Sequence, residues 1–83
     1  MYYNCPPAYL LVFHGSRDPR PQKAALELAL LIAQGLPAHS PVEIAALELA
    51  AIPLQQKIIN LALDSPVVRI IPLFLLPGVH VTQ

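Results

Sequence analysis

Several residue types that point to particular protein classes are scarce or missing in this chain. Its 83 residues include no tryptophan, one cysteine and only 12% charged residues. The single Cys5 cannot form an internal disulfide, which excludes a scaffold held together by its own disulfides. Five basic side chains balance five acidic ones, so the chain lacks the basic surface that is typical of nucleic-acid-binding domains.

Unbroken hydrophobic runs long enough to cross a membrane are also missing. A spanning helix needs about 18–20 consecutive apolar residues. The longest candidate, residues 67–81, is interrupted by Arg69, two prolines, Gly78 and His80. Residues 1–7 contain neither a basic segment nor an apolar run, so we expect no secretory signal. These features predict a soluble cytoplasmic protein without nucleic-acid or membrane partners.

Apolar side chains, by contrast, are abundant. Hydrophobic residues make up 55% of the sequence, against about 45–50% in ordinary globular domains. A chain of this length forms one domain, and so small a domain buries only about 60% of its unfolded surface. We therefore expect a flexible leader over residues 1–8 and a single domain over residues 9–83. We also expect a homo-oligomer in which another copy covers part of the apolar surface.

Hydrophobic patterning predicts three strands that alternate with two helices. Apolar runs without polar alternation are typical of strands buried on both faces. Pro21 and Pro53 suit the first turn of a helix, and Gly35 suits the position that follows a helix. Pro72 disfavours a central ladder position, so the third strand lies at an edge or ends there. The predicted strands are residues 9–13, 42–49 and 67–75, and the predicted helices are residues 22–34 and the segment between Pro53 and Asp64.

The order strand, helix, strand, helix, strand predicts a three-layer α/β fold. Each helix is a crossover, so the strands should be parallel. Right-handed crossovers leave few topologies, and we favour the strand order 2-1-3 with a helix on each face. Ligands of such sheets bind beyond the carboxyl ends of the strands, where the chain reverses direction.

Three side chains that can bind a metal follow the predicted carboxyl ends. His14 directly follows the first strand, Glu48 lies near the end of the second, and His80 lies just past the third. Neighbouring parallel strands are about 4.8 Å apart, so the three groups can converge. Two imidazoles and a carboxylate suit divalent iron, cobalt, nickel or zinc and leave positions open for a substrate. Taken singly, each histidine is more simply a capping or surface residue and Glu48 a surface carboxylate, whereas their joint placement favours a metal site.

The segment after His14 adds residues that can bind an anion. Arg17 and Arg20 lie beside the proposed site and can bind substrate carboxylates, although both also suit a solvated surface. Residues 14–16 match a phosphate-binding loop only weakly, because its glycine patterns are missing. A hydrolase with Ser16 as nucleophile and His80 as base is weaker still, because the G-x-S-x-G motif is missing.

Three segments together resemble a known enzyme family. They are residues 10–18 (LLVFHGSRD), 47–50 (LELA) and 71–82 (IPLFLLPGVHVT). In order and spacing they resemble the motifs of the small class II tetrapyrrole chelatases, the sirohydrochlorin cobalto- and ferrochelatases. The resemblance implies a flavodoxin-like, chelatase-like fold. It also implies an enzyme that inserts a divalent metal into a tetrapyrrole precursor of vitamin B12 or sirohaem.

The resemblance also implies roles for individual residues. His14 and His80 match the metal-binding and catalytic histidines, and Glu48 matches the acidic metal ligand. The metal, Co²⁺, Fe²⁺ or Ni²⁺, is the substrate, so no permanent cofactor is expected. The residues expected to bind the anionic tetrapyrrole are Ser16, Arg17 and Arg20.

The chain departs from the family pattern at two places. Family members usually carry glycine before the first histidine, where this chain has Phe13, whose ring would crowd the macrocycle or stack on it. Family domains continue past the second histidine with an acidic residue, a helix and a fourth strand, whereas this sequence ends at Gln83. We therefore expect a half domain that lacks its last helix and strand and pairs with another copy through its third strand. The alternatives are a non-catalytic module that binds metal or tetrapyrrole, and a structural fragment that oligomerises.

Overall fold

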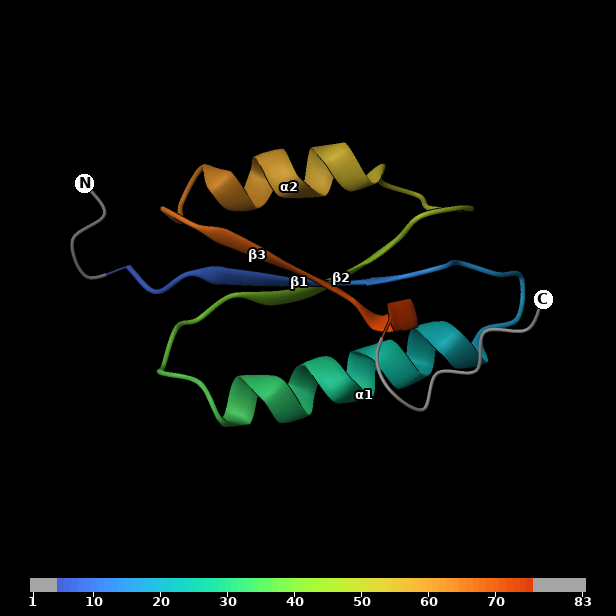
Figure 1. Ribbon diagram of the computed structural model, residues 1–83, viewed down its shortest axis with the longest axis horizontal. Helices are drawn as coiled ribbons and strands as arrows, with labels where there is room; N and C mark the ends of the chain where they lie inside the picture. The colour runs from blue at the N-terminus through green and yellow to red at the C-terminus, as the bar shows by residue number, and fades with distance from the viewer. Residues whose placement is uncertain (1–4, 76–83) are drawn as a thin grey trace.

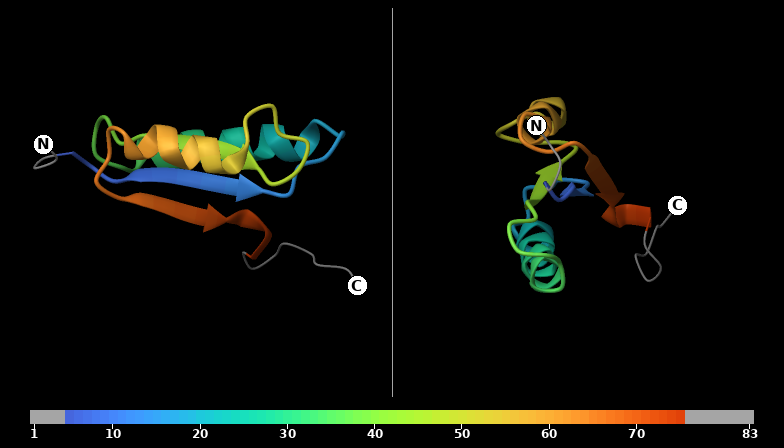
Figure 2. Two further views of the ribbon diagram at one scale, coloured as in Figure 1. Left: turned by 90° about the horizontal axis from the view of Figure 1, so that it is seen from above. Right: turned by 90° about the vertical axis from the view of Figure 1, so that its left-hand side faces the viewer.

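Three parallel strands form a sheet at the centre of the molecule, with one helix on each side of it (Figure 1 and Figure 2). The computed structural model describes residues 5–75 of the chain. The elements are β1 (Ala8–Phe13), α1 (Arg20–Gln34), β2 (Val42–Ala46), α2 (Leu54–Ala62), β3 (Val68–Pro72) and a 3₁₀ helix, η1 (Leu73–Leu75).

β1 is the central strand because its side chains are apolar on both faces. It pairs in parallel with β2 on one side and with β3 on the other. Leu10 and Leu11 are both completely buried, although consecutive residues of a strand point to opposite faces. The sheet order is β2-β1-β3, so the predicted three-layer fold, its parallel strands and its strand order are confirmed.

The two helices cover the sheet with different side chains. On one face, Leu10 and Val12 pack with Leu61 of α2. On the other face, α1 lies against β1 and β2 and buries Ala25 and Ala29. These small side chains let the helix lie close to the larger side chains of the strands. Within the described residues, neither helix is long and apolar enough to cross a bilayer.

The second strand is shorter than the sequence predicts. It ends at Ala46 rather than at residue 49. The backbone N–H of Glu48 still donates to the carbonyl of His14 at 3.0 Å, so the chain runs alongside β1 for two more residues. Leu49 then adopts a left-handed conformation with φ of 57°, which turns the chain away from the sheet. Glu48 therefore lies in a bend beyond the strand and not within it.

Other predicted boundaries differ by smaller amounts. β3 ends at Pro72 and continues as η1 rather than as strand to residue 75, because proline has no N–H to extend the ladder. The prediction that Pro72 marks a strand end is confirmed. β1 begins at Ala8, one residue early, so this buried residue belongs to the sheet and not to the leader. Gly35 ends α1 as expected, but with φ of −91°, which any residue can adopt.

Candidate functional site

The loops that follow β1 and β2 meet at the carboxyl edge of the sheet. His14 directly follows β1, and Glu48 lies two residues beyond β2. Their backbones are joined by the hydrogen bond from Glu48 N–H to the His14 carbonyl. Nδ1 of His14 lies 3.8 Å from Oε2 of Glu48. The structure thus brings together two of the three side chains that the sequence predicts as metal ligands.

Gly15 makes this close approach possible. Its φ is +93°, a conformation that residues with a side chain rarely adopt. A Cβ atom on Gly15 would also collide with the carbonyl oxygen of Glu48. Two independent requirements, backbone conformation and space, therefore demand glycine directly after His14.

The side chains of His14 and Glu48 are both open to solvent, at 70% and 67% exposure. Attraction between exposed groups is weak, so their own interaction does not fix the pair. Metal–nitrogen and metal–oxygen bonds to such side chains are about 2.0–2.2 Å long. After a small rotation, the imidazole and the carboxylate can therefore bind the same divalent ion.

Phe74, from η1, contacts the imidazole of His14. The two ring centroids are 5.6 Å apart and the rings are inclined by 53°. Phe74 also packs against the apolar cluster between the sheet and α2. His14 therefore lies between a ring anchored in the core and the carboxylate of Glu48.

The loop that leads into α1 is held by its own polar side chains. The hydroxyl of Ser16 accepts a hydrogen bond from the Asp18 N–H at 2.9 Å. The carboxylate of Asp18 accepts from the Arg20 N–H at 2.9 Å and from two guanidinium nitrogens at 2.9 and 2.6 Å. These bonds to Arg20 lower the pKa of Asp18 below its ordinary value of 3.8, because they stabilise the carboxylate.

The predicted substrate-binding residues therefore differ in their availability. Arg20 is already paired with Asp18, so contact with a substrate requires it to exchange this partner. Arg17 is exposed and forms no ion pair with any residue in the range 5–75. Ser16 is exposed but its oxygen already accepts the loop hydrogen bond, which leaves its O–H free to donate.

The third predicted metal ligand, His80, lies outside the described residues. Within residues 5–75, no group of three histidine, cysteine or acidic side chains lies close enough to hold a metal ion. The convergence of all three predicted ligands therefore stays a prediction. Phe13, which stands where the chelatases usually have glycine, is buried at the end of β1.

Two residues that shape the site were not assigned a role from the sequence. Gly15 has a local signal, since a glycine directly after a strand and a histidine suggests an unusual backbone conformation. Phe74 has none, because its contact with His14 arises only when β3 pairs with β1.

Comparison with known proteins adds an independent observation. The family model CbiX matches residues 8–83, which is almost the entire chain and includes all three motif segments. No curated protein and no solved structure matches the chain.

Proposed function

Because the chain belongs to the CbiX family of class II tetrapyrrole chelatases, we propose that it inserts Co²⁺ or Fe²⁺ into sirohydrochlorin or a closely related tetrapyrrole. Ni²⁺ is a third candidate ion. The product would serve cobalamin or sirohaem biosynthesis. The observation that carries the proposal is the 3.8 Å approach of the His14 imidazole to the Glu48 carboxylate at the carboxyl edge of the sheet.

In this proposal the incoming ion first binds to the protein. His14 and Glu48 supply a nitrogen and an oxygen, and we propose His80 as the third ligand. One carboxylate balances part of the ion's charge. Three protein ligands leave coordination positions open, so the nitrogens of the macrocycle can replace the protein ligands one after another. A closed set of four protein ligands would instead retain the metal.

Insertion also requires an acceptor for protons. As the divalent ion enters the ring, two pyrrole N–H bonds break and two protons leave, so charge is conserved. An imidazole exchanges a proton near neutral pH and is a suitable base. When the ion passes to the macrocycle, the freed nitrogen of His14 accepts one proton, its 70% exposure lets that proton pass to water, and the same imidazole can then accept the second proton.

The anionic substrate is steered by the loop before α1. Arg17 is exposed and can form charge-assisted hydrogen bonds with peripheral carboxylates of the tetrapyrrole. Arg20 takes part by exchanging Asp18 for a substrate carboxylate, and the hydroxyl of Ser16 donates a hydrogen bond. Because Arg20 must first lose a partner, we expect Arg17 to contribute more to substrate binding.

The test is the absorption change on insertion of Co²⁺ into sirohydrochlorin. His14→Ala and His80→Ala should each lower the insertion rate by at least about 100-fold, the usual contribution of a positioned base. His39→Ala is the matched control, since His39 is an exposed loop histidine. Rates that stay at the wild-type level in both variants would reject the site. Binding of Co²⁺ without turnover by the wild-type chain would indicate the non-catalytic alternative.

We also propose that copies of the chain associate through β3. β3 pairs with β1 on one side, and within residues 5–75 no strand pairs with its other side. Ile70 on this strand is 47% exposed. Ile70→Lys and Ile71→Lys should therefore reduce the mass measured by light scattering to that of one chain. A wild-type chain that is monomeric at high concentration would exclude this association.

A further inference from the structure

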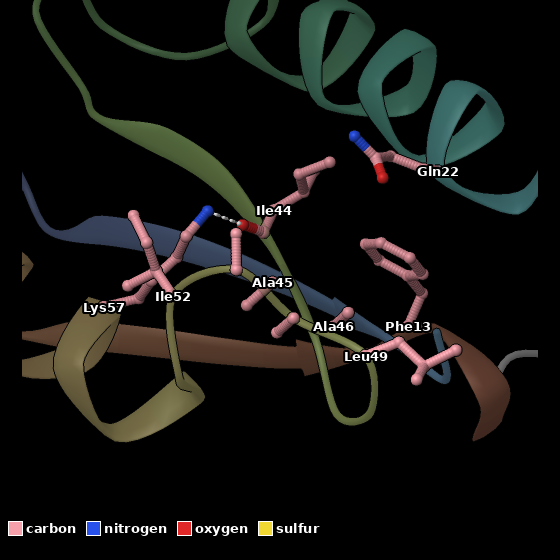
Figure 3. Close-up of a pocket in the computed structure, with 10 residues that line it drawn as sticks. Phe13, Gln22, Ile44, Ala45, Ala46, Leu49, Ile52 and Lys57 are labelled. Atoms are coloured by element: carbon pink, nitrogen blue, oxygen red, sulfur yellow. Dashed lines mark hydrogen bonds between the residues drawn. The ribbon is translucent and has the colours of Figure 1, made fainter. Parts of the chain in front are cut away.

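A pocket of about 190 Å³ lies along the outer side of β2 (Figure 3). Two of its lining residues are direct neighbours of the proposed site residues in the chain: Phe13 precedes His14, and Leu49 follows Glu48. The lining is otherwise mostly apolar, with Gln22 of α1 and Lys57 of α2 as its polar members.

Lys57 brings a positive charge to this apolar pocket. Its side chain is partly buried, and Nζ donates a hydrogen bond of 2.6 Å to the carbonyl of Ile44 (Figure 3). An ammonium group has three donors, so two remain after this bond. No carboxylate among residues 5–75 forms an ion pair with Lys57. A partly desolvated cation without a charged partner favours the binding of an anion.

We propose that this pocket binds an aliphatic carboxylate side chain of the tetrapyrrole substrate, with the carboxylate on Lys57 and the hydrocarbon against Phe13 and Ile44. The inference rests on the proposed function and adds that the macrocycle carries an aliphatic carboxylate arm at its periphery. It predicts that the enzyme prefers tetrapyrroles with free carboxylic acids over neutral esters.

The size and position of the pocket fit such an arm. Pockets for whole drug-sized ligands occupy about 300–1,000 Å³, so 190 Å³ accommodates a short arm and not the macrocycle. Leu49 and Ile52 line the pocket yet are 68% and 45% exposed, so it opens to solvent. Consecutive Cα atoms are about 3.8 Å apart, which places Phe13 and Leu49 within reach of an arm whose macrocycle lies above His14.

The first experiment uses butyrate, which has the chemistry of the arm alone. Titration of the ¹⁵N-labelled chain with butyrate should shift the amide signals of the pocket lining and the side-chain amide of Gln22. Butylammonium, with a similar hydrocarbon and the opposite charge, should not. Lys57→Met should weaken butyrate binding about tenfold, as expected for a lost charge-assisted hydrogen bond. Lys57→Arg should retain binding.

The chain offers a matched control for this substitution. Lys23 is its other lysine and is exposed on α1. Lys23→Met should leave butyrate binding unchanged. Butyrate binding that is equal in wild type and Lys57→Met would overturn the proposal and leave Lys57 with the sole role of covering the Ile44 carbonyl. An unchanged amide spectrum outside the pocket verifies that each variant is folded.

The second experiment uses sirohydrochlorin. Lys57→Met should raise KM about tenfold with little change in kcat, because the arm binds equally in the ground and transition states. An unchanged KM would overturn the assignment of the pocket to the substrate arm. If the wild-type chain binds sirohydrochlorin in a Lys57-dependent manner but inserts no metal, the proposed function fails and the pocket assignment stands.

Discussion

The body of the sheet and its carboxyl edge differ sharply in the solvent exposure of their side chains. The change occurs between Phe13, the last residue of β1, and His14. Leu11 is completely buried and Phe13 is buried, whereas the side chain of the next residue, His14, is 70% exposed. Residues that stabilise the fold therefore directly precede those proposed to bind metal. Substitutions on the two sides of this boundary should separate stability from activity.

The largest effect on stability is expected in the body of the sheet. Leu11→Ala removes a fully buried side chain from the central strand and should lower the free energy of unfolding by about 2–5 kcal/mol. The total free energy of unfolding of a native protein is only about 5–15 kcal/mol, so the urea concentration at the midpoint of unfolding should fall markedly. Leu31→Ala, at a side chain that is 65% exposed, should change the free energy of unfolding by less than about 0.5 kcal/mol. Equal losses in the two variants would contradict the assigned core.

An intermediate effect is expected at Gly15, where the two regions join. Gly15→Ala forces a Cβ into the left-handed region, at about 1–2 kcal/mol, and against the carbonyl oxygen of Glu48. We expect a loss of about 2–3 kcal/mol in urea denaturation and weaker Co²⁺ binding, because Glu48 must move away from His14. Gly35→Ala is the control. Its φ is −91° and a Cβ there has ordinary contacts, so both quantities should stay near wild type.

A smaller effect on stability is expected at Phe74, which contacts both the core and His14. Phe74→Leu keeps an apolar side chain against the core and should cost about 1 kcal/mol or less of folding free energy. It removes the ring that contacts His14, so the visible absorption spectrum of bound Co²⁺ should change. Phe74→Tyr keeps the ring and should restore that spectrum. If the Co²⁺ spectrum changes with the folding stability of the two variants and not with the presence of the ring, Phe74 acts only as a core residue.

The smallest effect is expected in the loop before α1. Because Arg20 lowers the pKa of Asp18, their interaction is present above pH 3.8 and is lost as the pH falls through the lowered pKa. Arg20→Gln should return the pKa of Asp18 towards 3.8, as measured by NMR titration of its carboxyl carbon. Both side chains are accessible, so the change in folding stability should be slight. An Asp18 pKa that is the same in both proteins would show that the pair does not form in solution.

The fold could be predicted well because its main signals are local. The continuous apolar run of β1 indicated a central strand, and the prolines at positions 21, 53 and 72 marked the starts of the helices and the end of β3. Helices between successive strands then determined parallel pairing. An exception is the end of β2, which lies at Ala46 rather than at residue 49 and is followed by Leu49 with a positive φ. Leucine gives no sign of such a conformation, because residues with a large side chain rarely adopt it.

The candidate site could be predicted only in part, because its details depend on contacts between distant segments. The meeting of His14 with Glu48 followed from their positions after neighbouring parallel strands. The contact of Phe74 with His14 and the pairing of Arg20 with Asp18 depend on side-chain orientations that no spacing reveals. The pocket beside Lys57 likewise requires α2 and the loop before it to be placed against β2.

The hydrogen bond from Lys57 to Ile44 bears on how far the proposed association through β3 could extend. Exposed strand edges invite further strands, and charged side chains are a common means of blocking them. The Lys57 ammonium group occupies a carbonyl on the outer side of β2, whereas the charged side chain of β3, Arg69, lies over the ring of Tyr9 and forms no such bond to a carbonyl of its own strand. In two copies joined β3 to β3 by a two-fold axis, the β2 edges that carry Lys57 would lie at the two ends of the combined sheet of described strands, which disfavours extension into a filament.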